Sequence, residues 1–130
     1  MENITRKQAK KIIKKGTKKI SDLDLQKVID NQSFFEKIIN ENKALKDTIS
    51  FVKLFISLVK DYFAGKYKDV PYWSIAAITF SLLYLFNPID FVPDFIPIVG
   101  FVDDALILAT CYKMIKVDLN KYEKWKSKNV

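Results

Sequence analysis

The sequence predicts an all-α, single-domain bundle of about five helices, organised around a central apolar helical hairpin. Apolar residues recur at steps of three and four through most of the chain, which is the spacing of one helix face. Residues 70–89 carry no charge, and residues 87–104 hold three of the four prolines. A chain of 130 residues is long enough for one domain with its own core.

The segment at residues 87–104, which we call the Pro/Asp corner, interrupts the helical pattern. Proline disfavours helical geometry in the residue before it, which here restricts Asn87, Val92 and Ile96. We therefore expect the chain to turn back at the corner and to join two apolar helices. The residues that define the corner are Asn87, Pro88, Asp90, Pro93, Asp94, Pro97, Gly100, Asp103 and Asp104.

The aspartates of the corner allow two interpretations. In the first, Asp90 and Asp94 cap their own turns, and Asp104 interacts with the dipole of the next helix. In the second, Asp90, Asp94 and Asp103 hold a hard divalent cation that activates water. Adjacent helical residues point about 100° apart, so Asp103 and Asp104 cannot both face one site. We favour the structural interpretation, because buried polar groups are usually paired, and we predict no catalytic residue and no cofactor.

Four motifs occur in order in the second half of the chain. They read Tyr84-Leu-Phe-Asn-Pro-Ile-Asp90, Pro93-Asp-Phe-Ile-Pro97, Gly100-Phe-Val-Asp-Asp104 and Lys121-Tyr-Glu-Lys-Trp125. Together they resemble the YkvA-like family of small bacterial proteins, and the resemblance extends over roughly residues 43–126. It implies a helical domain. The family has no established activity, so the resemblance implies no catalytic residues.

Composition excludes several kinds of site. The chain has no histidine and only three glycines, which excludes histidine acid–base catalysis, Cys/His zinc sites, Ser-His-Asp triads and glycine-rich phosphate loops. The single cysteine, Cys111, excludes an internal disulfide and is predicted to be a small core residue. No uninterrupted apolar stretch follows the basic N-terminus, so we expect a cytoplasmic protein without a secretory signal.

The net charge of +7 lies entirely in residues 1–20, which we predict to form a basic amphipathic helix preceding a helical domain at 21–130. Three interpretations remain open: the helix has a solvated face, it binds the anionic inner membrane surface, or it contacts nucleic-acid phosphates. The absence of interleaved aromatic residues makes nucleic acid the least favoured. The lysines concerned are Lys7, Lys10, Lys11, Lys14, Lys15, Lys18 and Lys19.

The next three predicted helices precede the charge-free run. Serine-based capping boxes at residues 21–24 and 33–36 predict short helices at 22–30 and 34–40. The clearest amphipathic helix follows at 41–65. Its two adjacent apolar stripes predict burial against at least two partners. Its charged residues are assigned to the remaining, exposed face: Lys46, Asp47, Lys53, Lys60 and Asp61.

The charge-free helix predicted at 72–86 has two interpretations. A membrane span needs about 20 apolar residues, or about 17 at the short end. The run reaches that length only by including helix-breaking prolines. We favour the buried central helix of a soluble bundle, with a membrane-inserted hairpin of 72–86 and 101–117 as the rival. The last helix, at 101–126, starts apolar and ends mixed, so its second half should be peripheral, with Trp125 covering an edge.

These features predict a non-enzymatic scaffold or interaction module with an unidentified protein partner. It would act in the cytoplasm or at the cytoplasmic membrane, either peripherally through the lysine-rich helix or integrally through the hairpin. The second hypothesis is a metal-binding protein or metal-dependent enzyme that uses the Pro/Asp corner. The third is a nucleic-acid-associated protein that uses the basic end.

Overall fold

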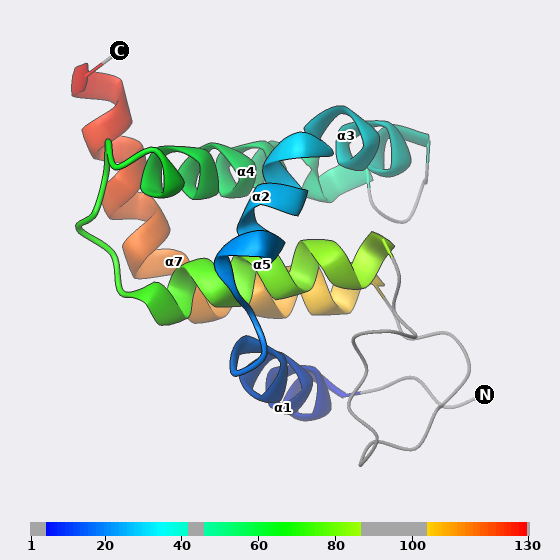
Figure 1. The fold of residues 1–130 in the computed structure, drawn as a ribbon. Coiled ribbons are helices and arrows are strands. Elements are labelled where there is room, and N and C mark those ends of the chain that lie inside the picture. Colours follow the sequence, from blue (N-terminus) through cyan, green and yellow to red (C-terminus); the bar gives the residue numbers. More distant parts are fainter. Residues whose placement is uncertain (1–4, 42–45, 87–103, 130) are drawn as a thin grey trace.

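The computed structural model describes residues 5–41, 46–86 and 104–129, and the regular structure of these ranges is entirely helical (Figure 1). The prediction of an all-α bundle is confirmed, with six α-helices in the described ranges where about five were expected. The elements are α1 (Arg6–Thr17), α2 (Asp22–Asp30), α3 (Gln32–Glu41), the short 3-10 helix η1 (Lys46–Thr48), α4 (Ile49–Phe63), α5 (Tyr72–Phe86) and α7 (Asp104–Asn129).

Local hydrogen bonds determine where the first two helices begin. Thr5 and Gln8 form a capping box before α1, in which the Gln8 amide donates to Thr5 Oγ1 at 3.1 Å. Ser21 and Asp24 form the predicted box before α2, where the Ser21 amide donates to Asp24 Oδ2 at 2.9 Å. Only Asn31 separates α2 from α3. The helix predicted at 34–40 therefore begins two residues early, at Gln32.

The amphipathic helix predicted at 41–65 is shorter in the structure. The chain forms η1 first, and α4 then runs from Ile49 to Phe63. Gly65 ends it as predicted, with a φ of 80° that glycine adopts without strain. The amides of Gly65 and Lys66 donate to the carbonyls of Tyr62 and Asp61, the pattern of a Schellman motif.

Helix α5 is the centre of the molecule. It contacts α1, α2, α4 and α7, and every residue from 74 to 84 is buried (Figure 1). The buried hydroxyls of Thr79 and Ser81 donate to carbonyls one turn back, at 2.8 and 2.9 Å, so they need no partner outside the helix. The predicted central apolar helix is thus confirmed.

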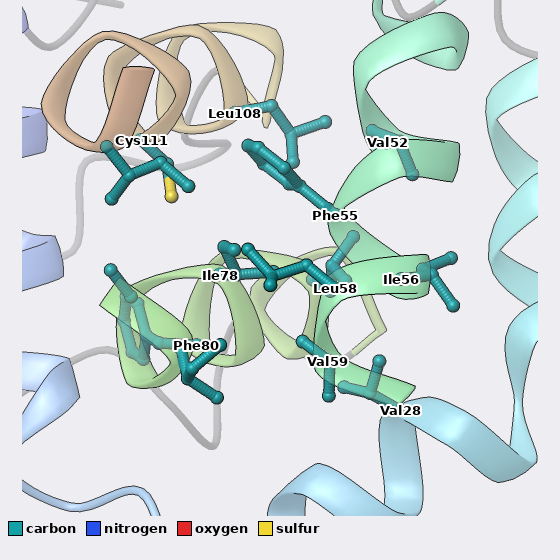
Figure 2. Close-up of a cluster of buried hydrophobic side chains, with 14 of the residues drawn as sticks. Val28, Val52, Phe55, Ile56, Leu58, Val59, Ile78, Phe80, Leu108 and Cys111 are labelled. Carbon is teal, nitrogen blue, oxygen red and sulfur yellow. The ribbon is translucent and has the colours of Figure 1, made fainter. Parts of the chain in front are cut away.

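The remaining helices supply the shell around α5. Figure 2 shows side chains of α2, α4, α5 and α7 meeting in one cluster, which includes Val28, Phe55, Ile78 and Leu108. Cys111 belongs to this cluster as predicted. Burial raises the pKa of its thiol to about 12, although a hydrogen bond with Ser81 opposes the shift, so the thiol stays protonated and unreactive at neutral pH.

Helix α1 packs against both α5 and α7. Its apolar stripe is buried there, together with Gly16, which faces the ring of Phe80. A Cβ atom at position 16 would overlap this ring. Glycine therefore permits the close approach of the two helices, and α1 shares its core with the helices that follow it.

We predict that Gly16→Ala destabilises the protein. Alanine at an exposed helical position gains about 1 kcal/mol over glycine. Here overpacking against Phe80 costs about 1–3 kcal/mol, so the net free energy of unfolding should fall. Urea denaturation followed by circular dichroism measures this change.

The matched control places Gly16→Ala in a Phe80→Leu background. The smaller side chain leaves room for the new methyl group, so the cost of Gly16→Ala should shrink or change sign there. An alanine that stabilises the otherwise unchanged protein would contradict the packing of α1 on α5.

Candidate anion-binding surfaces

The described residues present two lysine-rich surfaces, and neither is the Pro/Asp corner. The candidate metal ligands Asp90, Asp94 and Asp103 lie outside the described residues. Within the described ranges, no three Cys, Asp or Glu side chains lie close enough together to hold a metal ion. Of the corner, only Asp104 is described, as the first residue of α7. The metal site therefore stays a prediction, as do the roles proposed for Asn87, Pro88, Asp90, Pro93, Asp94, Pro97, Gly100 and Asp103.

The first surface is the outer face of α1. All seven predicted lysines are exposed, as is Arg6. Successive helical residues are rotated by about 100°, which places four lysines of α1 and its C-cap directly opposite the buried stripe, with Lys10 and Lys15 along its flanks. The four are Lys7, Lys11, Lys14 and Lys18. Because the apolar stripe is packed against α5 and α7, an external ligand of α1 would contact its charged side chains and not its apolar ones.

The second surface is a pocket of about 430 Å³ between the connector that follows α4 and the end of α7. We call it the α7 pocket. Lysines outnumber the one carboxylate among its described lining residues, which are Lys66, Tyr67, Lys68, Asp69, Lys121, Lys124, Trp125, Lys128 and Asn129. Sequence reasoning missed this pocket. The available signal was the spacing of Lys121, Lys124 and Lys128, which places all three on one side of a helix.

Two of the pocket lysines already have partners. Lys121 Nζ lies 2.8 Å from Asp69 Oδ2, and this hydrogen bond raises the pKa of Lys121. Lys68 Nζ lies 3.9 Å from the ring centroid of Tyr62, within the range of a cation–π contact. The other three, Lys66, Lys124 and Lys128, form no ion pair with any described residue. Their charges can act on an anion, although the charge of Lys66 also acts on Asp61.

Tyr67 forms the inner wall of the α7 pocket. Its side chain packs against both Tyr122 and Trp125, with ring centroids at 5.1 and 5.0 Å, and the residue is only 4% exposed. Its hydroxyl is buried and has no hydrogen-bond partner among the described residues. Burial, and after it the charge of Asp69, raises the pKa of Tyr67, so the hydroxyl remains a donor at neutral pH.

Next to this wall lies a carboxylate, Asp61, for which the sequence-based prediction was wrong. Asp61 was assigned to the exposed face of its helix, but it is only 9% exposed. Tyr122 Oη donates to Asp61 Oδ2 at 2.5 Å, and Lys126 Nζ donates to the same oxygen at 3.0 Å. Tyr122 Oη also lies 2.6 Å from Ser57 Oγ. The assignment was wrong because Tyr122, 61 residues away, gives the carboxylate a buried partner.

Comparisons with known proteins bear on the helices around the Pro/Asp corner. A family model described as a protein of unknown function (DUF1232) matches residues 74–110, from α5 into α7. Over 90 residues, 69% of this chain and 85% of its relative, the sequence is 33% identical to a protein of Bacillus subtilis (strain 168). That relative is named "Uncharacterized membrane protein YkvA". This chain belongs to the YkvA family.

The resemblance seen in the sequence motifs is thus confirmed, and the YkvA family remains one of unknown function. No solved structure matches the chain. The relative's name calls it a membrane protein, whereas among the helices described here none combines the length and apolarity that a membrane crossing requires. Association with a membrane is compatible with both findings.

The Asp61 network predicts an acid-sensitive component of stability. Burial raises the pKa of Asp61, but hydrogen bonds from Tyr122 and Lys126 outweigh it, so the net pKa lies below the usual value. A carboxylate with a lowered folded-state pKa stabilises above about pH 4 and loses that contribution as the pH falls through the folded-state value. Asp61→Asn should therefore cost about 1–3 kcal/mol at pH 7 and much less near pH 2.

Urea denaturation at a series of pH values measures this difference. Glu123→Gln is the matched control, because Glu123 is an exposed carboxylate on α7 and its loss should change the free energy of unfolding by less than about 0.5 kcal/mol. A cost for Asp61→Asn that is the same at both pH values would show that the charge of Asp61 does not stabilise the fold.

Proposed function

We propose that this YkvA-family protein is a non-enzymatic helical module that binds peripherally to the anionic inner face of the cytoplasmic membrane through α1, leaving its other faces free for a protein partner. The observation that carries the proposal is the exposure of seven lysines, five within α1 and two directly after it, on a helix whose apolar residues are already buried. The rest of the chain is neutral in sum, so the excess positive charge of the protein lies at this end of the chain.

The magnitude of the attraction supports this mode of binding. Each lysine near an anionic surface contributes about 1 kcal/mol, and the contribution falls off within a Debye length of roughly 8–10 Å. Lys7, Lys11, Lys14 and Lys18 lie on the outermost line of α1 and would approach the lipid together. Their summed contribution of about 4 kcal/mol is enough for reversible attachment that salt weakens.

The position of α1 in the fold also suits this role. In Figure 1, α1 lies on one side of α5, while α3 and α4 lie on the opposite side. Attachment through α1 would therefore leave α3 and α4 facing away from the lipid. Because Gly16 holds α1 against Phe80, the helix would dock as part of the folded domain.

Vesicle flotation tests the proposal. The protein should float with vesicles that contain phosphatidylglycerol and stay behind with pure phosphatidylcholine vesicles. The variant Lys7→Gln/Lys11→Gln/Lys14→Gln/Lys18→Gln should lose at least about a hundredfold in partition coefficient, because about 4 kcal/mol of attraction is removed. Raising the salt to about 0.5 M should release the unchanged protein.

The matched control removes four charges on the far side of α5, with Lys37→Gln/Lys46→Gln/Lys53→Gln/Lys60→Gln. These lysines are exposed on α3, η1 and α4, and their loss should leave most of the binding intact. An equal loss of vesicle binding in both variants would contradict the proposal that α1 makes the contact. Tighter binding to duplex DNA than to the vesicles, through the same α1 lysines, would favour the nucleic-acid hypothesis instead.

A further inference from the structure

The α7 pocket is a second cationic feature, separate from α1 in the fold. In Figure 1 the connector between α4 and α5 and the end of α7 lie at one end of the bundle, away from the outer face of α1. We propose that the α7 pocket binds a small phosphomonoester, which Lys66, Lys124 and Lys128 hold by charge and which receives a hydrogen bond from Tyr67. This inference does not depend on the membrane role of α1.

The excess of positive charge in the pocket favours the binding of an anion. Asp69, the one carboxylate among the described lining residues, is engaged by Lys121, so it does not neutralise the other lysines. Lys124 and Lys128 are one helical turn apart, where like charges destabilise a helix by about 0.2–0.5 kcal/mol. Lys66 reaches the same pocket from the connector. A bound dianion would offset all three charges at once.

The hydroxyl of Tyr67 is the second, independent indication of a ligand. A buried hydroxyl without a partner costs about 1–3 kcal/mol, and Tyr67 Oη is in that position among the described residues. After burial, the charges that act on this hydroxyl are those of Asp69, Lys121 and Asp118, and the first two line the pocket. Tyr67 lines the pocket, so a small shift of the side chains that cover its hydroxyl would let an acceptor oxygen of a phosphate reach and satisfy it.

Size and charge identify the class of ligand. A volume of about 430 Å³ falls within the range of about 300–1,000 Å³ that is usual for small-molecule sites, and it exceeds the volume of a phosphate group alone. The wall formed by the half-buried Trp125 suits an organic substituent on the phosphate. A phosphomonoester carries about −1.5 to −2 charges at neutral pH, against one for a diester, and so matches three unpaired lysines better.

Fluorescence of Trp125 reports on the pocket directly. The chain has two tryptophans, so Trp73→Phe leaves Trp125 as the sole reporter. Titration with glycerol 3-phosphate at constant ionic strength should give a saturable change. The variant Lys66→Gln/Lys124→Gln/Lys128→Gln should bind at least about tenfold more weakly. The matched variant Lys7→Gln/Lys11→Gln/Lys14→Gln, with the same loss of charge on α1, should keep its affinity within about twofold.

Tyr67→Phe separates a binding role from a packing role. The change removes an unpartnered hydroxyl, so the melting temperature should stay the same or rise. The affinity for glycerol 3-phosphate should nevertheless fall about fivefold to tenfold, because a hydrogen bond to a charged acceptor is lost. An unchanged affinity would show that the hydroxyl takes no part in binding and would overturn that part of the assignment.

Two further comparisons decide the proposal. Dibutanoyl phosphatidic acid presents the same phosphomonoester on a lipid backbone. Binding of either this compound or glycerol 3-phosphate supports the site, and the tighter of the two identifies a lipid or a soluble source. A Trp125 signal that chloride reproduces at equal ionic strength, that does not saturate, or that the Lys66/Lys124/Lys128 variant retains in full would overturn the proposal.

Discussion

The enclosure of α5 is the constraint on which the rest of the structure depends. A helix buried at every position from 74 to 84 exposes no face to water, so other helices must cover it on all sides. Helices α1, α2, α4 and α7 do this. The enclosure is possible because the buried hydroxyls of Thr79 and Ser81 bond to carbonyls within α5, while the hydroxyl of Ser74 donates to Asp118 of α7 at 2.7 Å.

Because α5 is apolar and enclosed, each neighbouring helix must direct apolar or small side chains toward it. Helix α1 comes close enough to cover α5 only because position 16 lacks a side chain. The sequence of a basic amphipathic helix allows two roles for its apolar residues, because they can insert into lipid or pack in a protein core. The contact between α1 and α5 shows that they pack in the core here. In this fold the apolar residues of α1 are buried in the core, and its outer face consists of polar side chains, most of them lysines.

Features that depend on local sequence were predictable, and those that depend on distant partners were not. The absence of charge at residues 70–89 identified α5, and short-range capping identified the start of α2. The burial of Asp61 was not predictable, because its partner Tyr122 belongs to another helix and only the tertiary fold brings the two together. The α7 pocket was missed for the same reason, since its lysines come from two segments that are far apart in the sequence.

The two lysine-rich surfaces differ in physical character although both are cationic. On α1 the charges lie along an exposed helix and adjust to any anionic surface, so their effect is long-range, unspecific and easily screened. In the α7 pocket the charges lie around an aromatic wall in which the rings of Tyr67, Tyr122 and Trp125 pack against one another. Behind that wall the Asp61 network ties α4 to α7 and so fixes the two sides of the pocket relative to each other. A surface of the first kind suits attachment, whereas one of the second kind discriminates between ligands by shape and hydrogen bonding.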